Sequence, residues 1–213
     1  MLSWRIAQAT NKNRGCEAVE SNFFATVARM KYIERWALMR NTRPETLSEH
    51  TLEVSMIAHA LCVIGNVRYG KQLDANHAAM VGMYHDASEI ITGDMPTPIK
   101  YYNPSIKEAF KSIEDEANNK LLAQLPEDIK AEYQSIFFKD ETHAYEWKLV
   151  KAADKLSAMI KCLEEEKTGN REFVKAKEAT ETSLRKLACE LPEVADFMKE
   201  CLPAYSKTLD ELN

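Results

Sequence analysis

Residues 48–65 read SEHTLEVSMIAHALCVIG, a stretch in which apolar side chains recur every three or four residues. Ser48 is a favourable N-cap and Gly65 a common helix end, so the pattern predicts a helix between them. Its predicted core-facing stripe is Leu52, Met56, Ile57, Ala60, Leu61 and Ile64. A second helical pattern occupies about residues 141–167 and is stopped by Gly169.

The rest of the chain continues this helical pattern. Further helices are expected to begin near Phe23, after Asp74, after Asn103 or Ser105 and at Pro126, with two or three more beyond Gly169. The 213 residues include only six glycines and seven prolines, about half the usual share, which disfavours a turn-rich β fold. We therefore predict an all-α domain of seven to nine helices over residues 21–213, preceded by a poorly ordered extension over residues 1–20.

Composition excludes several classes of protein. Hydrophobic residues make up 45% and charged residues 29%, as in ordinary globular proteins, and the net charge is −5 without any run of Lys or Arg. A nucleic-acid polymer is therefore not an expected partner. We find no secretory h-region and no window approaching about 18 apolar residues, and the five cysteines are scattered. These features predict a soluble cytoplasmic protein without a membrane partner.

Four polar residues lie where a metal site could form. His85 and Asp86 are adjacent, His50 falls in the first turn of its helix, and Asp154 stands among small and apolar positions where an unpaired carboxylate would be costly. Together they offer two nitrogen and two oxygen ligands to a divalent cation, contributed by three helical segments. A buried ion-pair network with Lys151 or Lys155 is the alternative interpretation.

Longer motifs accompany these four positions. They are YHDASE at 84–89, TGDMPTPIK at 92–100, RWALMRN at 35–41 and SEH at 48–50. The set resembles the bacterial 5′-deoxynucleotidases of the HD-domain metal-dependent phosphohydrolases, and the similarity extends from about Phe23 to the C-terminus. The resemblance implies an HD-domain helical bundle, a homodimer, and hydrolysis of deoxyribonucleoside 5′-monophosphates to the deoxyribonucleoside and phosphate, with discrimination against ribonucleotides.

The resemblance also implies roles for individual residues. His50, His85, Asp86 and Asp154 would bind one divalent cation, which could be Co, Mn, Zn, Mg or Fe. Glu89, Arg35 and Asp86 would be catalytic, with Glu89 orienting or deprotonating the attacking water. The implied substrate-binding residues are Arg35, Trp36, Asp86, Asp94, Met95, Pro96, Thr97 and Asp154. Arg35 would hold the phosphate, Asp94 would accept from the sugar 3′-OH, and the Trp36 indole would exclude a 2′-OH.

Two alternatives stay open at this point. One is another HD-domain phosphohydrolase activity, on a cyclic dinucleotide, an alarmone or a nucleoside triphosphate. The other is a non-catalytic nucleotide-binding protein on the same fold. The short motifs around Arg35 and Asp94 favour a small monophosphate, and all four metal-ligand positions are present.

Overall fold

The computed structural model describes residues 20–100 and 102–212. The predicted N-terminal extension, residues 1–20, lies outside this part of the chain except for its last residue. Within the described residues the protein is helical, and the one β feature is an isolated antiparallel bridge between Glu34 and Thr46. The prediction of an all-α fold is confirmed.

Ten α-helices are described, and eight of them are longer than four residues. They are α1 Phe23–Val27, α2 Leu47–Tyr69, α3 Ala75–Tyr84, α4 Glu89–Thr92, α5 Thr97–Lys100, α6 Pro104–Leu122, α7 Glu127–Phe137, α8 Ala144–Lys167, α9 Val174–Glu190 and α10 Pro192–Glu200. Short 3₁₀ turns follow α1, precede α9 and close the C-terminal region.

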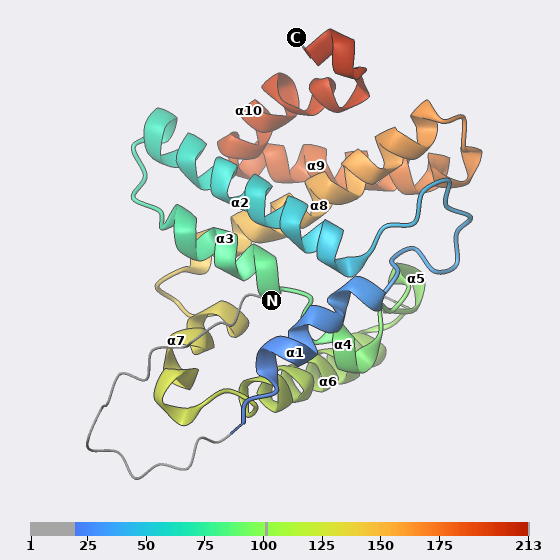
Figure 1. Ribbon diagram of the computed structural model, residues 1–213. Helices are drawn as coiled ribbons and strands as arrows, with labels where there is room; N and C mark the ends of the chain where they lie inside the picture. Colours follow the sequence, from blue (N-terminus) through green and yellow to red (C-terminus); the bar gives the residue numbers. More distant parts are fainter. Residues whose placement is uncertain (1–19, 101, 213) are drawn as a thin grey trace, which may run out of the picture.

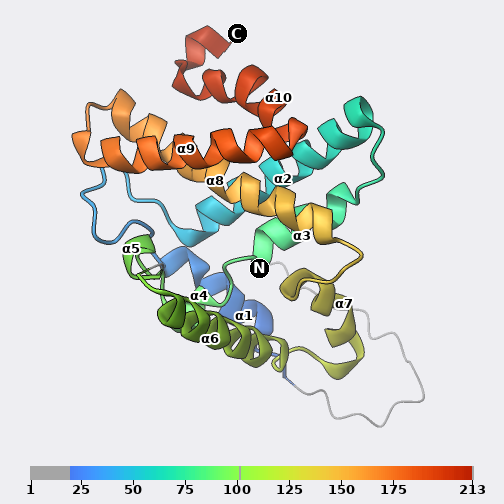
Figure 2. The same ribbon diagram turned by 180° about the vertical axis from the view of Figure 1, so that it is seen from behind.

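The helices form two packed regions that meet at one end of α2 (Figures 1 and 2). The larger hydrophobic core lies among α2, α3, α8, α9 and α10, and includes Val54, Leu61, Leu156 and Val194. The smaller core joins α1, the first residue of α2, α6 and α7 around Phe23. Two buried residues of this smaller core are Leu47, in the first turn of α2, and Ala87, in the turn after α3. Both segments are thereby held at the junction of the two regions.

The inward face of α2 differs from the predicted stripe. Ile57 and Leu61 are buried as expected, but Leu52 and Met56 are 51% and 59% exposed. Small residues take their place, because α3 packs very closely on α2. A Cβ atom added at Gly82 of α3 would lie 2.9 Å from the Cα of Ser55. Apolar spacing alone did not reveal which side of the helix a close neighbour would cover.

The ends of α2 also differ from the prediction. Thr46 is the N-cap instead of Ser48, and it forms a capping box in which Thr46 and Glu49 each accept a hydrogen bond from the other's backbone. The helix continues past Gly65 to Tyr69 and is capped by Gly70, whose φ of 63° is the left-handed conformation that glycine adopts without strain.

Helix α2 is both long and apolar. Contrary to the expectation that no such window exists, it is long and apolar enough to cross a membrane by length and composition. Half of its most apolar window is nevertheless buried inside the protein. Its packing against α3 and α8 is that of a central core helix.

Candidate metal and substrate site

His85 and Asp86 lie in the turns that follow α3. The predicted helix from Asp74 does begin there, with the Asp74 side chain accepting from the His77 backbone. It ends at Tyr84, however, and residues 85–88 form turns before α4 begins at Glu89. Asp86 and Glu89 therefore do not lie on one continuous helix. The Glu89 N–H still donates to the Asp86 carbonyl at 3.0 Å, so the two residues stay adjacent.

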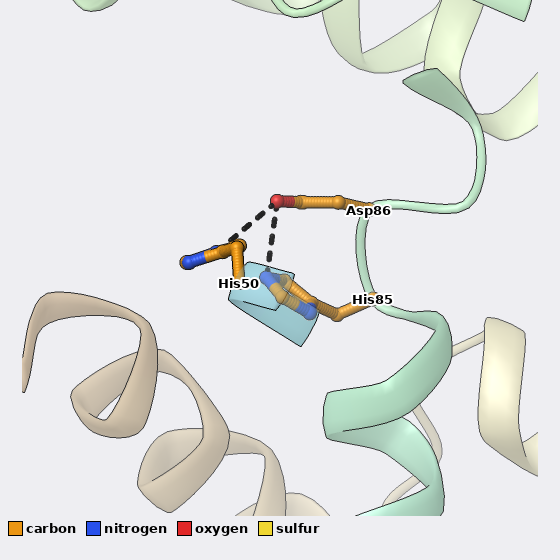
Figure 3. Close-up of side chains that lie close together, drawn as sticks. All are labelled: His50, His85 and Asp86. Carbon is orange, nitrogen blue, oxygen red and sulfur yellow. Dashed lines mark ion pairs between the residues drawn. The ribbon is translucent and has the colours of Figure 1, made fainter. Parts of the chain in front are cut away.

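His50, His85 and Asp86 come together at the junction of the two packed regions. Figure 3 shows both imidazoles directed at the Asp86 carboxylate. Asp86 Oδ2 lies 3.1 Å from His85 Nε2 and 3.6 Å from His50 Nε2. Three donor atoms from these residues lie within 4.8 Å of one another, close enough to share one metal ion. Asp154, on α8, places Oδ1 3.4 Å from His50 Nε2.

The hydrogen bonds of the two histidines leave the same nitrogen of each ring free. His85 Nδ1 lies 2.7 Å from the Gly82 carbonyl, to which it can only donate. His50 Nδ1 lies 3.0 Å from Ser157 Oγ, and that hydroxyl donates to Glu53 at 2.6 Å, so it accepts from His50. In the neutral form of each ring the lone pair therefore lies on Nε2, and both Nε2 atoms are buried without a hydrogen-bond partner in the described residues. Two orphaned nitrogens beside two carboxylates fit a divalent cation.

The charges of the site agree with this fit. Burial lowers the pKa of His50 and keeps its imidazole neutral, which is the form that ligates a metal. Burial opposes ionisation of Asp86, but His85 and then Arg35 outweigh it and hold the Asp86 pKa below its usual value. The Asp154 pKa is also lowered against burial, chiefly by the adjacent His50 and then by Lys155. Both carboxylates are thus anions at neutral pH.

Arg35 and Glu89 border this cluster. Arg35 Nη1 lies 3.3 Å from Asp86 Oδ2, and although burial alone would lower the Arg35 pKa, Asp86 and the other nearby carboxylates raise it. Glu89 is 5% exposed and its Oε2 has no hydrogen-bond partner among the described residues. Burial, followed by the charges of Asp86 and Asp94, raises the Glu89 pKa to about 9. An unpaired buried carboxyl is costly unless it faces a ligand or water.

The loop after α4 contains the remaining predicted residues. Gly93 ends α4 with a φ of 73°, a conformation that an L side chain would strain. Asp94, Met95 and Pro96 follow it and are half-buried. Asp94 is close enough for its charge to act on Arg35 and Glu89. The side chain of Thr97 lies outside what the structure describes.

Sequence reasoning missed four residues that hold the site from outside. Ser157 and Glu53 support His50, as described above. Glu45, in residues 40–47, which the sequence indicates only as a linker because of Pro44, contacts Arg35 and Trp36. Glu165 accepts from the Thr42 backbone at 2.9 Å and pairs with Lys161 at 2.5 Å, which fixes the same linker to α8. The capping pattern TLSE at 46–49 was a readable signal, but the contacts of Ser157 and Glu165 join residues more than 100 positions apart in the chain.

A pocket beside the site has a different character. It is lined by Arg43, Pro44, Glu45, Glu49, Glu53, Ile160, Lys161 and Glu164. Four glutamates against two cations make its wall acidic, which opposes binding of a phosphate. The cationic Arg35 beside the His and Asp cluster is the more suitable place for an anion.

Comparison with known proteins defines the class in agreement with this geometry. The protein has the fold of an HD-domain phosphohydrolase: a solved example from Listeria innocua superposes with a TM-score of 0.75 at 22% identity, covering 86% of this chain and 88% of that one. The cyanophage S-2L HD phosphohydrolase DatZ, solved with dA and one catalytic Zn²⁺ ion, superposes with a TM-score of 0.57 at 22% identity over 86% of this chain and 96% of that chain.

Sequence similarity assigns the protein to a narrower family than the fold does. The family model described as 5′-deoxynucleotidase YfbR-like matches residues 22–205. A 5′-deoxynucleotidase of Yersinia pseudotuberculosis is 45% identical over 193 residues, which are 91% of this chain and 97% of the relative. The chain belongs to the 5′-deoxynucleotidase YfbR-like family. The predicted family, and with it the prediction of an enzyme of this class, is confirmed.

Proposed function

We propose that this protein hydrolyses deoxyribonucleoside 5′-monophosphates to the deoxyribonucleoside and inorganic phosphate in a reaction that requires a divalent cation. The observation that carries the proposal is the meeting of His50, His85, Asp86 and Asp154, with two unpartnered Nε2 atoms, directly beside the Arg35 guanidinium. The names of the curated relatives support the same activity, and they favour it over a cyclic dinucleotide, an alarmone or a triphosphate as substrate.

The four ligands would hold one cation, and they do not by themselves select among Co, Mn, Zn, Mg and Fe. A cation bound there supplies Lewis-acid polarisation of a phosphoryl oxygen and favours ionisation of water. Asp86 and Asp154 also border the space in which the phosphate would lie. The Zn²⁺ of DatZ supports a cation in this fold.

The other residues act on substrate and proton. Arg35 presents a planar guanidinium that suits the phosphate oxygens and keeps the reacting phosphorus in line. Glu89 offers the buried, unpartnered Oε2 as the atom that orients the attacking water or, when the carboxyl is ionised, takes its proton. Asp94 accepts from the sugar 3′-OH, and Met95, Pro96 and Thr97 complete the sugar contacts.

Trp36 carries the discrimination between sugars. Its indole packs on Phe173, with ring centroids 5.3 Å apart, and presents a flat apolar surface. A ribose 2′-OH buried against that surface would lose its hydrogen bonds at a cost of about 1–3 kcal/mol, whereas deoxyribose would lose nothing.

The test is release of inorganic phosphate from dAMP and AMP with Mn²⁺ or Co²⁺, before and after EDTA. We expect cation-dependent turnover of dAMP that exceeds turnover of AMP. His85→Ala should abolish it, while His59→Ala, which removes an exposed histidine of α2, should not. Failure of the wild-type protein to release phosphate from either nucleotide with any cation would leave only a nucleotide-binding role.

We propose further that residues 21–213 act as one domain, that the protein is a cytoplasmic homodimer, and that mononucleotides are its substrates to the exclusion of nucleic-acid polymers and membranes. The free thiols of the four described cysteines support the reducing compartment.

The exposed Leu52 and Met56 of α2 support a self-complementary contact between two copies. Light scattering should show a dimer that Met56→Glu weakens and Ile113→Glu, an equally apolar exposed site on α6, leaves intact.

A further inference from the structure

Glu45 contacts two of the residues that the proposed function assigns to the substrate, Trp36 and Arg35. Its Oε2 accepts a hydrogen bond from the Trp36 indole Nε1 at 2.7 Å and lies 3.4 Å from Arg35 Nε. The Glu45 side chain is 14% exposed and that of Arg35 12%, so the pair is largely removed from water. One carboxylate oxygen therefore restrains the indole and the guanidinium together.

Backbone hydrogen bonds also hold the segment around Glu45 beside Arg35. The Arg35 N–H donates to the Glu45 carbonyl at 2.9 Å, and the Leu47 N–H donates to the Ile33 carbonyl at 2.8 Å. These bonds run on both sides of the Glu34–Thr46 bridge and join the two segments in antiparallel fashion. The Glu45 side chain thus starts from a backbone position that is already tied to Arg35.

Trp36 requires such restraint. It is the one described residue other than glycine with a positive φ, 61°, a conformation that a residue with a bulky side chain rarely adopts. Such strained positions persist where surrounding contacts determine them, and they cluster at functional sites. The contacts here are Phe173 against the indole ring and Glu45 at its N–H.

We infer that Glu45 is a positioning residue for sugar selectivity: by holding the Trp36 indole and the Arg35 guanidinium with one carboxylate, it sets the distance between the surface that excludes a 2′-OH and the group that binds the phosphate. This inference rests on the proposed function for the meaning of selectivity. The part of the inference that concerns geometry, namely that Glu45 determines the position of Trp36, does not depend on any activity.

Two substitutions separate the contacts. Glu45→Gln keeps an oxygen that can accept from the indole N–H but removes the charge opposite Arg35, whereas Glu45→Ala removes both. We expect Glu45→Ala to lower the ratio of kcat/KM for dAMP to that for AMP by about tenfold or more, and Glu45→Gln to retain most of it. In a Trp36→Ala background Glu45→Ala should lower the ratio no further, because its effect passes through Trp36. Glu34→Gln, an exposed neighbour of Arg35 with the same change of charge, is the matched control.

A second measurement needs no substrate. The indole N–H of Trp36 should give a ¹⁵N–¹H resonance, assigned by its loss in Trp36→Phe, that shifts and exchanges faster with water in Glu45→Ala but not in Glu34→Gln. An unchanged resonance, or an unchanged dAMP to AMP ratio in an active Glu45→Ala protein, would overturn the inference and leave the proposed function intact. Absence of turnover in the wild-type protein would instead overturn the proposed function and the selectivity role, while the resonance still decides whether Glu45 positions Trp36.

Discussion

Ser157 Oγ stands 3.0 Å from Nδ1 of His50, and the same hydroxyl donates to the Glu53 carboxylate at 2.6 Å. The chain from Glu53 through Ser157 to His50 turns the free Nε2 of His50 toward Asp86 and Asp154. Partners of this kind fix the tautomer and orientation of a ligating histidine. The contact joins α2 to α8 and makes the site depend on the packing of these two helices.

Ser157→Ala should weaken cation binding without unfolding the protein. The His50 ring would lose the acceptor that selects its tautomer, and loss of such a partner typically lowers metal affinity by about 10–100-fold. Calorimetric titration of the cation-free protein with Mn²⁺ measures this. Ser183→Ala, which removes a hydroxyl bonded only within α9, should leave the affinity unchanged. Equal affinities in wild type and Ser157→Ala would show that helix packing alone orients His50.

Glu53 makes the stability of the fold depend on pH. Burial, aided by Glu45 and Glu164, raises the Glu53 pKa from 4.5 to about 7. The folded protein holds this proton more tightly than the unfolded chain, so the stability it contributes is complete below about pH 4.5 and is lost as the pH rises through about 7. The free energy of unfolding of Glu53→Gln should therefore rise relative to that of the wild type between pH 5 and pH 8, by about 1–3 kcal/mol.

Thermal unfolding in EDTA at several pH values, where cation binding does not contribute, measures the gain. Glu178→Gln, at an exposed position of α9, should show no such trend. A difference between Glu53→Gln and wild type that stays constant from pH 5 to pH 8 would mean that Glu53 ionises normally in the folded protein.

Asp154→Asn tests the cation site with little change in shape. The substitution removes the charge 3.4 Å from His50 Nε2 and leaves a weaker oxygen ligand. We expect Mn²⁺ binding and dAMP turnover to fall together, each by at least about 100-fold. Calorimetry and phosphate release on the same preparation give both values. If instead His50, His85 and the two aspartates form only an ion-pair network, turnover would survive and EDTA would have no effect on the wild type.

What the sequence could predict was limited by distance along the chain. Local signals placed the helices well: Asp74 and Asn103 cap α3 and α6 as expected, and Gly169 follows α8. Asp154 was recognisable because a carboxylate stood among apolar neighbours. Glu45, Ser157 and Glu53 carried no comparable signal. Glu45 looks like any Glu in a linker, and Ser157 looks ordinary until the fold brings it to Glu53 and His50, which are 104 and 107 positions away in the sequence. The family motifs supplied the residues that we propose to touch the substrate, but not the residues that hold them in place.

Gly82 lies at a close contact between α3 and α2 that its place in the sequence does not show. In most helices Gly→Ala is stabilising by about 0.5–1 kcal/mol, because alanine restricts the unfolded chain more. At Gly82 the new methyl group would lie 2.9 Å from Ser55 Cα and 3.0 Å from Ser55 N, both backbone atoms that cannot swing aside. The two helices would have to separate, at a cost of about 1–3 kcal/mol. Gly82→Ala should thus lower Tm by several degrees, and because His85 donates to the Gly82 carbonyl, Mn²⁺ affinity should fall as well. Met80→Ala, exposed on the same helix, should change neither. A higher Tm in Gly82→Ala would show that α2 and α3 have room to adjust.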